Sequence, residues 1–224
     1  MRSCQKAILG ILVLLAAFSI HAQEVVDKTV AVVTDGARKP QLITYSDILW
    51  QMALQPGVGL EKPSSEDLNR ALQILINQRI FALEAERLPR AAPSDKEIAD
   101  KIAETLGYFP TTAAFETRLK QVGFASVKDD AFERLIAQRV AIEKYIDFRF
   151  RSFVVVTADE EQKYYRDIYT PEFRRRTPGL LLPPLEEKRP DIHQTLTNQK
   201  IATAIERFLD EAKRRVQVEI LIEV

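Results

Sequence analysis

Few residues in this chain have the type and spacing that chemistry requires. His193 follows Asp191 by two positions, and an imidazole can act as an acid, a base or a metal ligand near neutral pH. A transition-metal site needs more donors than this pair supplies, so His193 is expected to face solvent near a helix start. We find no nucleophile–base pair, phosphate-binding loop or paired-carboxylate site. We therefore expect no catalytic residue, no metal and no cofactor.

Other polar residues have the types and spacing that are expected at the N-termini of helices. Ser94 with Glu97, and Thr157 with Glu160, have the spacing of a capping box, in which a hydroxyl and a carboxylate bind free amides. Few glycines, and apolar residues that recur every three to four positions, predict a mostly helical chain. Helices are expected at residues 46–55, 65–88, 94–106, 112–122, 127–151 and 157–168, and from residue 190 onward.

Short strands are expected at both ends of the chain. Residues 29–33 and 42–44 flank a polar turn that contains glycine, which predicts a strand pair leading into a helix capped by Ser46. Residues 216–222 alternate apolar and polar side chains, which predicts a strand with one buried face. Two short strands alone are marginal, so the last strand is expected to join the first pair. The predicted fold class is mostly α with a small β-sheet whose N- and C-terminal strands pair.

Residues 1–22 have the three parts of a secretory signal peptide. Basic residues precede an uncharged, mostly apolar run of 14 residues (7–20), and Ala22 ends the segment before Gln23. Cleavage is expected between Ala22 and Gln23. An uncleaved membrane anchor is the alternative, but a spanning helix needs about 20 residues. We therefore expect a periplasmic or secreted protein without stable membrane insertion.

Loss of the leader changes the composition of the protein. The whole chain has 32 basic and 32 acidic side chains, and the leader removes two basic residues and no acidic one, so the exported chain is slightly acidic. The leader also contains Cys4, the single cysteine of the chain, so disulfides cannot stabilise the exported protein. A net charge near zero argues against a nucleic-acid partner, because phosphates require a basic face.

The order of several segments carries a family resemblance. The opening VVDKTVAVVTDGARKPQLITYSDI (25–48) leads through an ITYSD element into a helix, and LTNQKIATAIERFLDEAKRRVQVEIL (196–221) closes the chain. Between them stand LNRALQILINQRIFALEAERL (68–88), PSDKEIADKI (93–102), FETRLKQVGFASVKDDAFERLIAQRVAIEKYI (115–146) and VTADEEQKYYRDI (156–168). Together these segments resemble the SurA family of periplasmic chaperones, in which the N-terminal region and the last segment form one core module.

The resemblance implies a division of the chain into domains. Residues 23–173 correspond to the N-terminal helical core of that family, and residues 190–224 to the C-terminal helix and strand that complete it. Residues 174–189, rich in proline and arginine, are expected to be a linker. The family usually carries parvulin-type isomerase domains there, but this segment is far shorter than the roughly 50 residues of a small domain. The chain also lacks the parvulin glycine signature and histidine pair.

The resemblance implies an ATP-independent chaperone that binds unfolded outer-membrane or secreted proteins. Client binding is expected at apolar residues in excess of what the core needs, with a plain core or loop-anchoring role as the alternative for each. These candidates are Trp50, Met52, Tyr108 and Phe109, together with Phe148, Phe150 and Phe153, which are expected to cluster at the end of the long helix 127–151. The Arg174–Arg176 run is expected to be a solvated arm or a contact for acidic partners.

Two other functions stay open at this point. The chain could be a peptidyl-prolyl cis–trans isomerase or derive from one, although the missing domain argues against isomerase activity. It could also be an envelope adaptor or structural module with one fixed partner. Suppression of aggregation, acceleration of proline isomerisation and one stoichiometric partner are the observations that separate the three.

Overall fold

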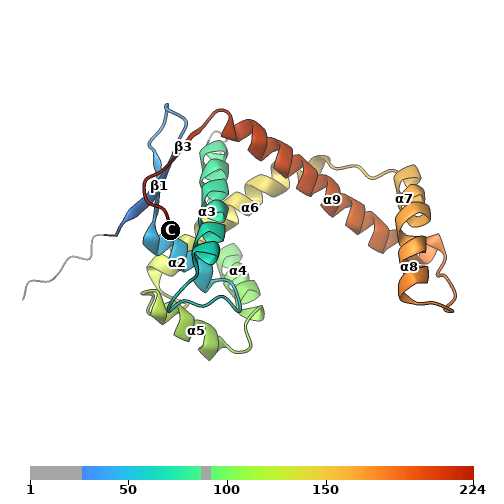
Figure 1. Cartoon of the computed structure of the whole chain (residues 1–224), viewed down its shortest axis with the longest axis horizontal. Coiled ribbons are helices and arrows are strands. Elements are labelled where there is room, and N and C mark those ends of the chain that lie inside the picture. The colour runs from blue at the N-terminus through green and yellow to red at the C-terminus, as the bar shows by residue number, and fades with distance from the viewer. Residues whose placement is uncertain (1–26, 87–91) are drawn as a thin grey trace, which may run out of the picture.

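The computed structural model describes residues 27–86 and 92–224. The predicted leader and its cleavage site at Ala22 and Gln23 lie outside the described residues. The chain forms a body with a projecting arm (Figure 1). We use "body" for residues 27–86, 92–156 and 200–224, and "arm" for residues 157–199.

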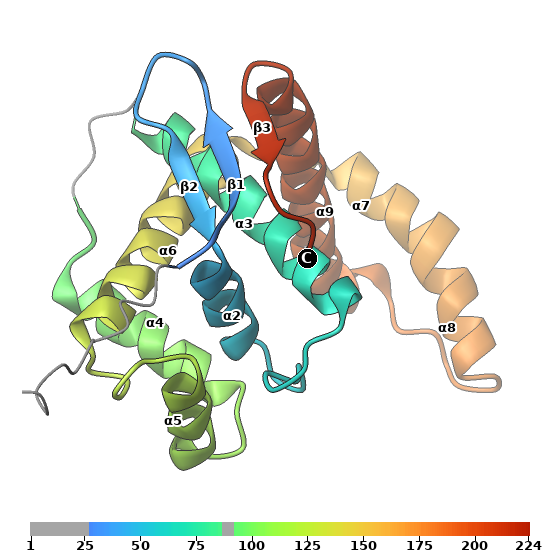
Figure 2. The same cartoon turned by 60° about the vertical axis from the view of Figure 1, so that its left-hand side comes forward.

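A three-stranded antiparallel sheet brings together the two ends of the described chain. Its strands are β1 (Thr29–Thr34), β2 (Gln41–Thr44) and β3 (Gln217–Ile220), in the order β2–β1–β3. Ala31 in the central strand lies opposite Ile43 on one side and Ile220 on the other. The predicted pairing of the N- and C-terminal strands is therefore confirmed (Figure 2).

The first two helices follow the sheet and pack against it. α2 (Tyr45–Ala53) is capped by Thr44 and not by the predicted Ser46. The Thr44 hydroxyl accepts the Asp47 amide at 3.2 Å, and the Asp47 carboxylate accepts the Thr44 amide at 3.0 Å. Thr44 takes this role because its backbone is still extended where β2 ends. α3 (Ser65–Ala85), capped by Ser64, contacts β1 and β2.

Three further helices complete the body, namely α4 (Asp95–Gly107), α5 (Thr112–Gln121) and α6 (Asp130–Arg149). Two of them, α4 and α5, form its lower part in Figure 1. The predicted capping box of Ser94 and Glu97 begins α4. Fully buried Phe115 and Phe132 lie edge to face, with ring centroids 6.0 Å apart, in a cluster separate from the core under the sheet. This cluster fixes α5 against α6.

The C-terminal helix ties the arm to the body. α9 (Leu185–Lys213) packs its last turns on α3, where the Phe208 ring stacks on Phe81 with centroids 5.4 Å apart. Tyr145 and Phe150 from the end of α6 complete this aromatic group. The predicted return of the last helix to the helical body is thus found in the main core.

The outer layer of the arm is one continuous helical rod. It consists of α7 (Ala158–Tyr164), a π-helical turn η3 (Tyr165–Tyr169) and α8 (Thr170–Arg176). The Thr170 amide donates to the Tyr165 carbonyl, five residues back, directly before Pro171. Pro171 has no amide hydrogen and cannot donate a helical hydrogen bond. The change from α-helical to π-helical hydrogen bonding just before it therefore costs few additional hydrogen bonds. The predicted Thr157–Glu160 capping box begins the rod.

The predicted linker at residues 174–189 is largely wrong. Arg174–Arg176 end α8, and α9 starts at Leu185, so only residues 177–184 are irregular. Pro190 lies inside α9 and does not begin it. Proline is tolerated there because it removes one hydrogen bond within the first two turns, while Glu186 and Glu187 favour the positive helix start.

The expected burial of one face of the last strand is also wrong. The register places Val218 and Ile220 on the same sheet face as Val33 and Ala31, which are fully buried, yet all four residues of β3 are exposed. The reason is the position of α3, which contacts the sheet at β1 and β2 and leaves the edge strand beyond its cover. Among the described helices, none is long and apolar enough to cross a membrane.

Candidate functional site

Four of the seven predicted client-binding residues are used by the fold. Met52, Phe109 and Phe150 are buried, the first and last in the main core and Phe109 beside Phe115 in the second cluster. Trp50 is partly buried, and its indole N–H donates to the Val122 carbonyl at 2.9 Å. These side chains hold helices together, so the structure does not present them to a client.

Tyr108 is exposed in the turn between α4 and α5. Its hydroxyl donates to Glu104 at 3.0 Å, and this hydrogen bond raises the pKa of the tyrosine above its usual value. The neighbouring Phe109 ring turns inward onto Phe115. Tyr108 thus stands as a single exposed aromatic ring with a polar anchor.

The remaining two predicted residues form an exposed aromatic patch between body and arm. Phe148 is 50% exposed, Phe153 is 70% exposed and Val155 is 71% exposed. The two rings lie edge to face with centroids 6.4 Å apart. We call Phe148, Phe153 and Val155 the junction patch. It is the place where apolar side chains of the predicted cluster are accessible.

The junction patch is presented by the way in which α6 ends. Phe150 leaves the helix inward and packs on Tyr145 and Phe208. A single 3-10 turn, η2 (Arg151–Phe153), then carries Phe153 outward. Because the buried ring anchors the turn, its neighbours remain exposed without loss of order in the backbone.

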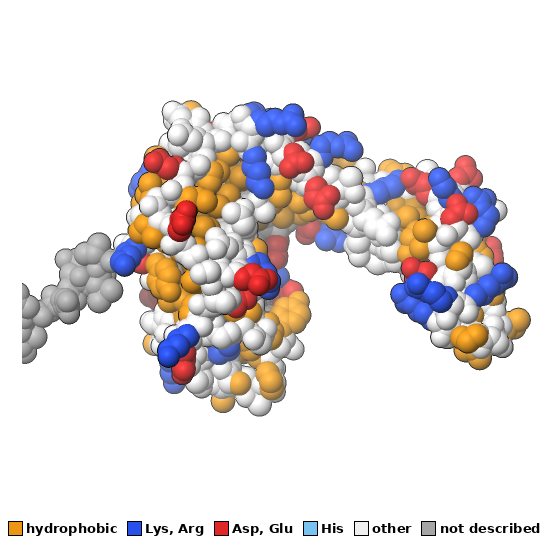
Figure 3. Space-filling view, in the orientation of Figure 1, with side chains coloured by type: hydrophobic (Ala, Val, Ile, Leu, Met, Phe, Trp, Pro, Cys, Tyr) orange, Lys and Arg blue, Asp and Glu red, His pale blue; other side chains and the backbone are white. Residues whose placement is uncertain are grey.

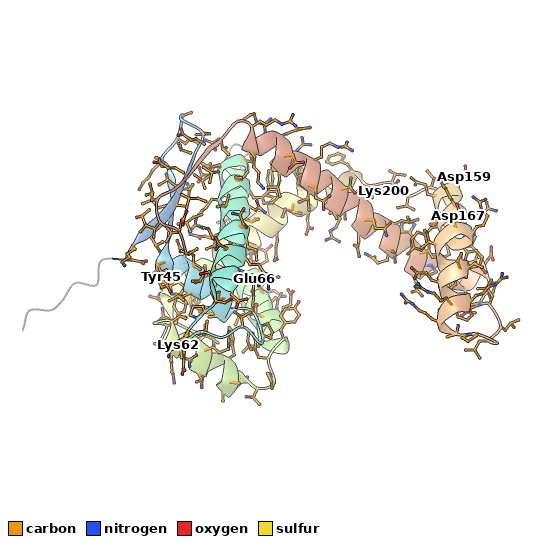
Figure 4. All side chains as sticks on the ribbon, in the orientation of Figure 1. Tyr45, Lys62, Glu66, Asp159, Asp167 and Lys200 are labelled. Atoms are coloured by element: carbon orange, nitrogen blue, oxygen red, sulfur yellow. The ribbon has the colours of Figure 1, made fainter. Side chains whose placement is uncertain are left out.

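A lysine on α9 holds the far end of the patch. The Lys200 ammonium donates to the Val155 carbonyl at 2.6 Å and to the Glu160 carboxylate at 2.7 Å. Lys200 lies on the stretch of α9 between the body and α7 (Figure 4). Its hydrogen bond is the main reason that the pKa of Glu160 is lowered. Lys200 therefore joins the patch, the α7 cap and α9 in one cluster that sequence spacing could not reveal.

The exposed edge of the sheet offers a second apolar surface. Its members are Val218, Ile220, Leu221 and Ile222, which we call the edge strip. Among the described strands β3 is an outer one, so alternate backbone amides and carbonyls along its free side have no strand partner there (Figure 2). Such an edge can pair with an added strand.

His193 has a contact that the sequence did not predict. Its Nδ1 atom lies 2.7 Å from the Glu161 carboxylate, which also accepts Arg189 at 3.1 Å. Glu161 on α7 is only 5% exposed, whereas both partners on α9 reach solvent. This buried carboxylate fastens α7 to α9, and the imidazole serves that packing. Within residues 27–86 and 92–224, no group of three or more His, Cys, Asp or Glu side chains is placed to hold a metal ion.

A buried polar cluster links three helices of the body. Arg139 on α6 donates to Gln51 on α2 at 2.5 Å, and burial lowers the pKa of the guanidinium to about 10. The Nε atom of Arg139 and the Oδ1 atom of Asn77 have no hydrogen-bond partner there. Both residues line a shallow cleft of about 270 Å³ between α3 and α6, beside Phe81. Both unpaired atoms are shielded from solvent, so we assign this cluster to helix packing.

Comparison with known proteins does not place this chain in a family. No protein family matches its sequence, and no curated protein matches it. The resemblance to the SurA family therefore stays a prediction from the sequence, and a function must be argued from the exposed surfaces.

Proposed function

We propose that this protein is an ATP-independent periplasmic chaperone that holds unfolded outer-membrane or secreted polypeptides. The observation that carries the proposal is the junction patch. Two phenylalanines and a valine are exposed together on an ordered segment, although each could lower its free energy by burial. A surface of this kind suits an unfolded chain, which offers apolar side chains in no fixed order.

The size of the patch fits reversible binding. Complete burial of one large apolar side chain contributes about 1.5–3 kcal/mol, and association and ordering of the client cost several kcal/mol. Three partly exposed side chains therefore support weak contacts that many sequences can satisfy. Release then needs no nucleotide, because each contact is easily lost.

The arrangement of body and arm favours an extended client. The space-filling view shows an open hollow below α9, between the body and the arm (Figure 3), whereas the connection from α6 to α7 passes above α9 in the same orientation (Figure 1). The junction patch lies on the segment that connects these two parts, and the edge strip lies on the body. A client strand along β3 could gain backbone hydrogen bonds in addition to apolar contacts.

The test is suppression of aggregation of several unrelated unfolded proteins, including a β-barrel precursor, by the chain from Gln23 onward. The triple variant F148S/F153S/V155S should bind clients at least about tenfold more weakly, because it loses most of the patch's apolar area. A matched control, I168S/L180S/L181S, removes three exposed apolar side chains that are not among the predicted client-binding residues. Thermal unfolding of both variants shows whether they remain folded.

The outcomes separate the three functions. Suppression by the wild type and the control, but not by the patch variant, supports the proposal. Equal suppression by both variants contradicts the role of the patch. Binding to one stoichiometric partner without suppression favours the adaptor. Faster cis–trans exchange of an X-Pro peptide favours the isomerase, and even weak activity would be visible because uncatalysed exchange takes roughly tens to hundreds of seconds.

A further inference from the structure

The free end of the arm carries two leucines that no other described part of the chain covers. Leu180 is 67% exposed and Leu181 is 94% exposed, in the loop that joins α8 to α9. Figure 3 shows hydrophobic surface at this end of the arm, with basic side chains next to it. We call Leu180, Leu181 and Arg174–Arg176 the arm tip.

The loop holds these leucines in a fixed position. On one side, the amide and the hydroxyl of Thr177 both donate to the Phe173 carbonyl, at 2.8 and 2.7 Å. On the other side, the Tyr165 hydroxyl donates to the Pro183 carbonyl at 2.7 Å. Stacking of Tyr165, Tyr169 and Phe173 along the rod supports both contacts. The exposed leucines are therefore displayed by a braced loop.

The charges beside the leucines are basic and only partly compensated. Arg176 pairs with Glu172 at 3.4 Å, while Arg174 and Arg175 form no ion pair within the described residues. All three guanidinium groups are exposed. The acidic residues at the start of α9 are engaged elsewhere, for example Glu186 with Arg189. The arm tip is therefore apolar at its end and positively charged at its side.

The fold accounts for only part of this arrangement. Basic residues at the C-terminus of a helix interact favourably with its dipole, which suits the arginines at the end of α8. The dipole gives no reason for two adjacent leucines at the extreme end of a solvated arm. Apolar and cationic groups side by side are what an anionic bilayer surface binds, because hydrocarbon and headgroup phosphate then each meet a matching partner.

We propose that the arm tip binds the surface of a membrane that contains anionic phospholipids. Leu180 and Leu181 enter the boundary between headgroups and acyl chains, and Arg174 and Arg175 contact lipid phosphates. Two weak signals of this kind together give reversible attachment to the surface and do not require a spanning helix. The contact uses the arm alone, so the junction patch stays available, and the inference does not depend on the chaperone proposal.

The test is sedimentation of the protein with vesicles, using the chain from Gln23 onward. This chain keeps every described residue and lacks the apolar run 7–20, which would itself bind lipid. Vesicles of phosphatidylcholine alone are compared with vesicles that contain phosphatidylglycerol. Binding is expected only to the second kind, and it should weaken as salt is raised because the lipid charges are then screened.

Two variants separate the contributions of the arm tip. R174E/R175E should lower partitioning by about 25-fold or more, because each basic residue near an anionic surface contributes about a fivefold factor. L180S/L181S should lower it by about tenfold or more through loss of apolar burial. K120E/K128E makes the same charge change at exposed positions on the body and should bind like the wild type.

Each outcome decides the inference. Binding to anionic vesicles that both tip variants lose, and the control keeps, supports it. Absence of binding, or equal binding by all variants, overturns it. A dimer of the wild-type chain in sedimentation equilibrium that L180S/L181S abolishes would make the tip an interface between copies, and would also overturn it.

Discussion

Two isoleucines show how position, and not residue type, decides what a side chain does. Ile43 on β2 and Ile220 on β3 lie on either side of Ala31 and on the same face of the sheet. Ile43 is completely buried, whereas Ile220 is 51% exposed. The difference follows from α3, which lies under β1 and β2. The same residue therefore stabilises the core at one position and forms part of an accessible surface at the other.

This pair gives a prediction about stability. Ile43→Ala should lower the free energy of unfolding by about 2–5 kcal/mol, because a buried aliphatic side chain is lost and a cavity remains. Ile220→Ala should lower it by less than about 1 kcal/mol, as is usual for an exposed position. Urea unfolding followed by circular dichroism measures both values. Equal losses at the two positions would mean that β3 is covered in solution.

At the scale of elements, some features of the fold follow from the local spacing of residues, and others depend on contacts between residues far apart in the sequence. The capping boxes at Ser94 and Thr157 were predictable because their partners lie three residues away. Pairing of β3 with β1 was predictable because a lone strand pair is marginal. The exposure of β3 was not predictable. Alternation of apolar and polar side chains shows that a strand has two different faces, but it does not show what covers each face. The start of α9 was missed because proline usually marks a helix beginning or end.

The candidate client-binding residues show the same contrast between what local spacing predicts and what distant contacts decide. The sequence identified the phenylalanines at the end of α6 as a group, and two of the three are exposed. It could not tell Phe150 from Phe148 and Phe153, because the direction of each ring depends on the turn η2 and on Phe208, far along the chain. The bridge from Lys200 to Val155 likewise joins residues 45 positions apart, which no local pattern encodes.

The contact between α4 and α6 predicts sensitivity to acid. Glu97 caps α4 and pairs with Lys144 of α6 at 2.7 Å. Hydrogen bonds from Lys144 and then Ser94 lower the pKa of Glu97 from its ordinary value of 4.5 to about 2. Because the folded pKa is below the unfolded one, the stabilisation is present above pH 4.5 and is lost as the pH falls towards 2.

Glu97→Gln should therefore make unfolding less dependent on pH in this window. The amide can still accept a hydrogen bond at the cap, but it no longer titrates. Thermal midpoints measured between pH 5 and about 2 should fall less steeply for the variant than for the wild type. Glu206→Gln is the control, since this exposed carboxylate on α9 forms no ion pair within the described residues. An identical slope for wild type and Glu97→Gln would contradict the assignment.

At the scale of the whole molecule, one helix connects the junction patch and the arm tip, for which we propose different roles. α9 runs from the arm into the main core, and the rod of α7 and α8 is fastened to it near Glu161 and Lys200. The arm tip is therefore held at a set distance from the junction patch, which belongs to the body. If the tip contacts a membrane while the patch holds a client, this spacing keeps the client beside the bilayer without inserting the body into it.

The spacing should depend on the Lys200 bridge. Lys200→Met removes the contacts to Val155 and Glu160, each pair being partly exposed, so the loss of stability should be small and the fold should persist. The rod should then sample a wider range of positions relative to the body. Spin labels at Gln162→Cys on α7 and Lys62→Cys on the body can report this distance, because the chain from Gln23 contains no other cysteine. The distance distribution should broaden in Lys200→Met and stay narrow in the control Lys213→Met; an unchanged width would show that the Glu161 cluster and the continuity of α9 are sufficient to hold the arm.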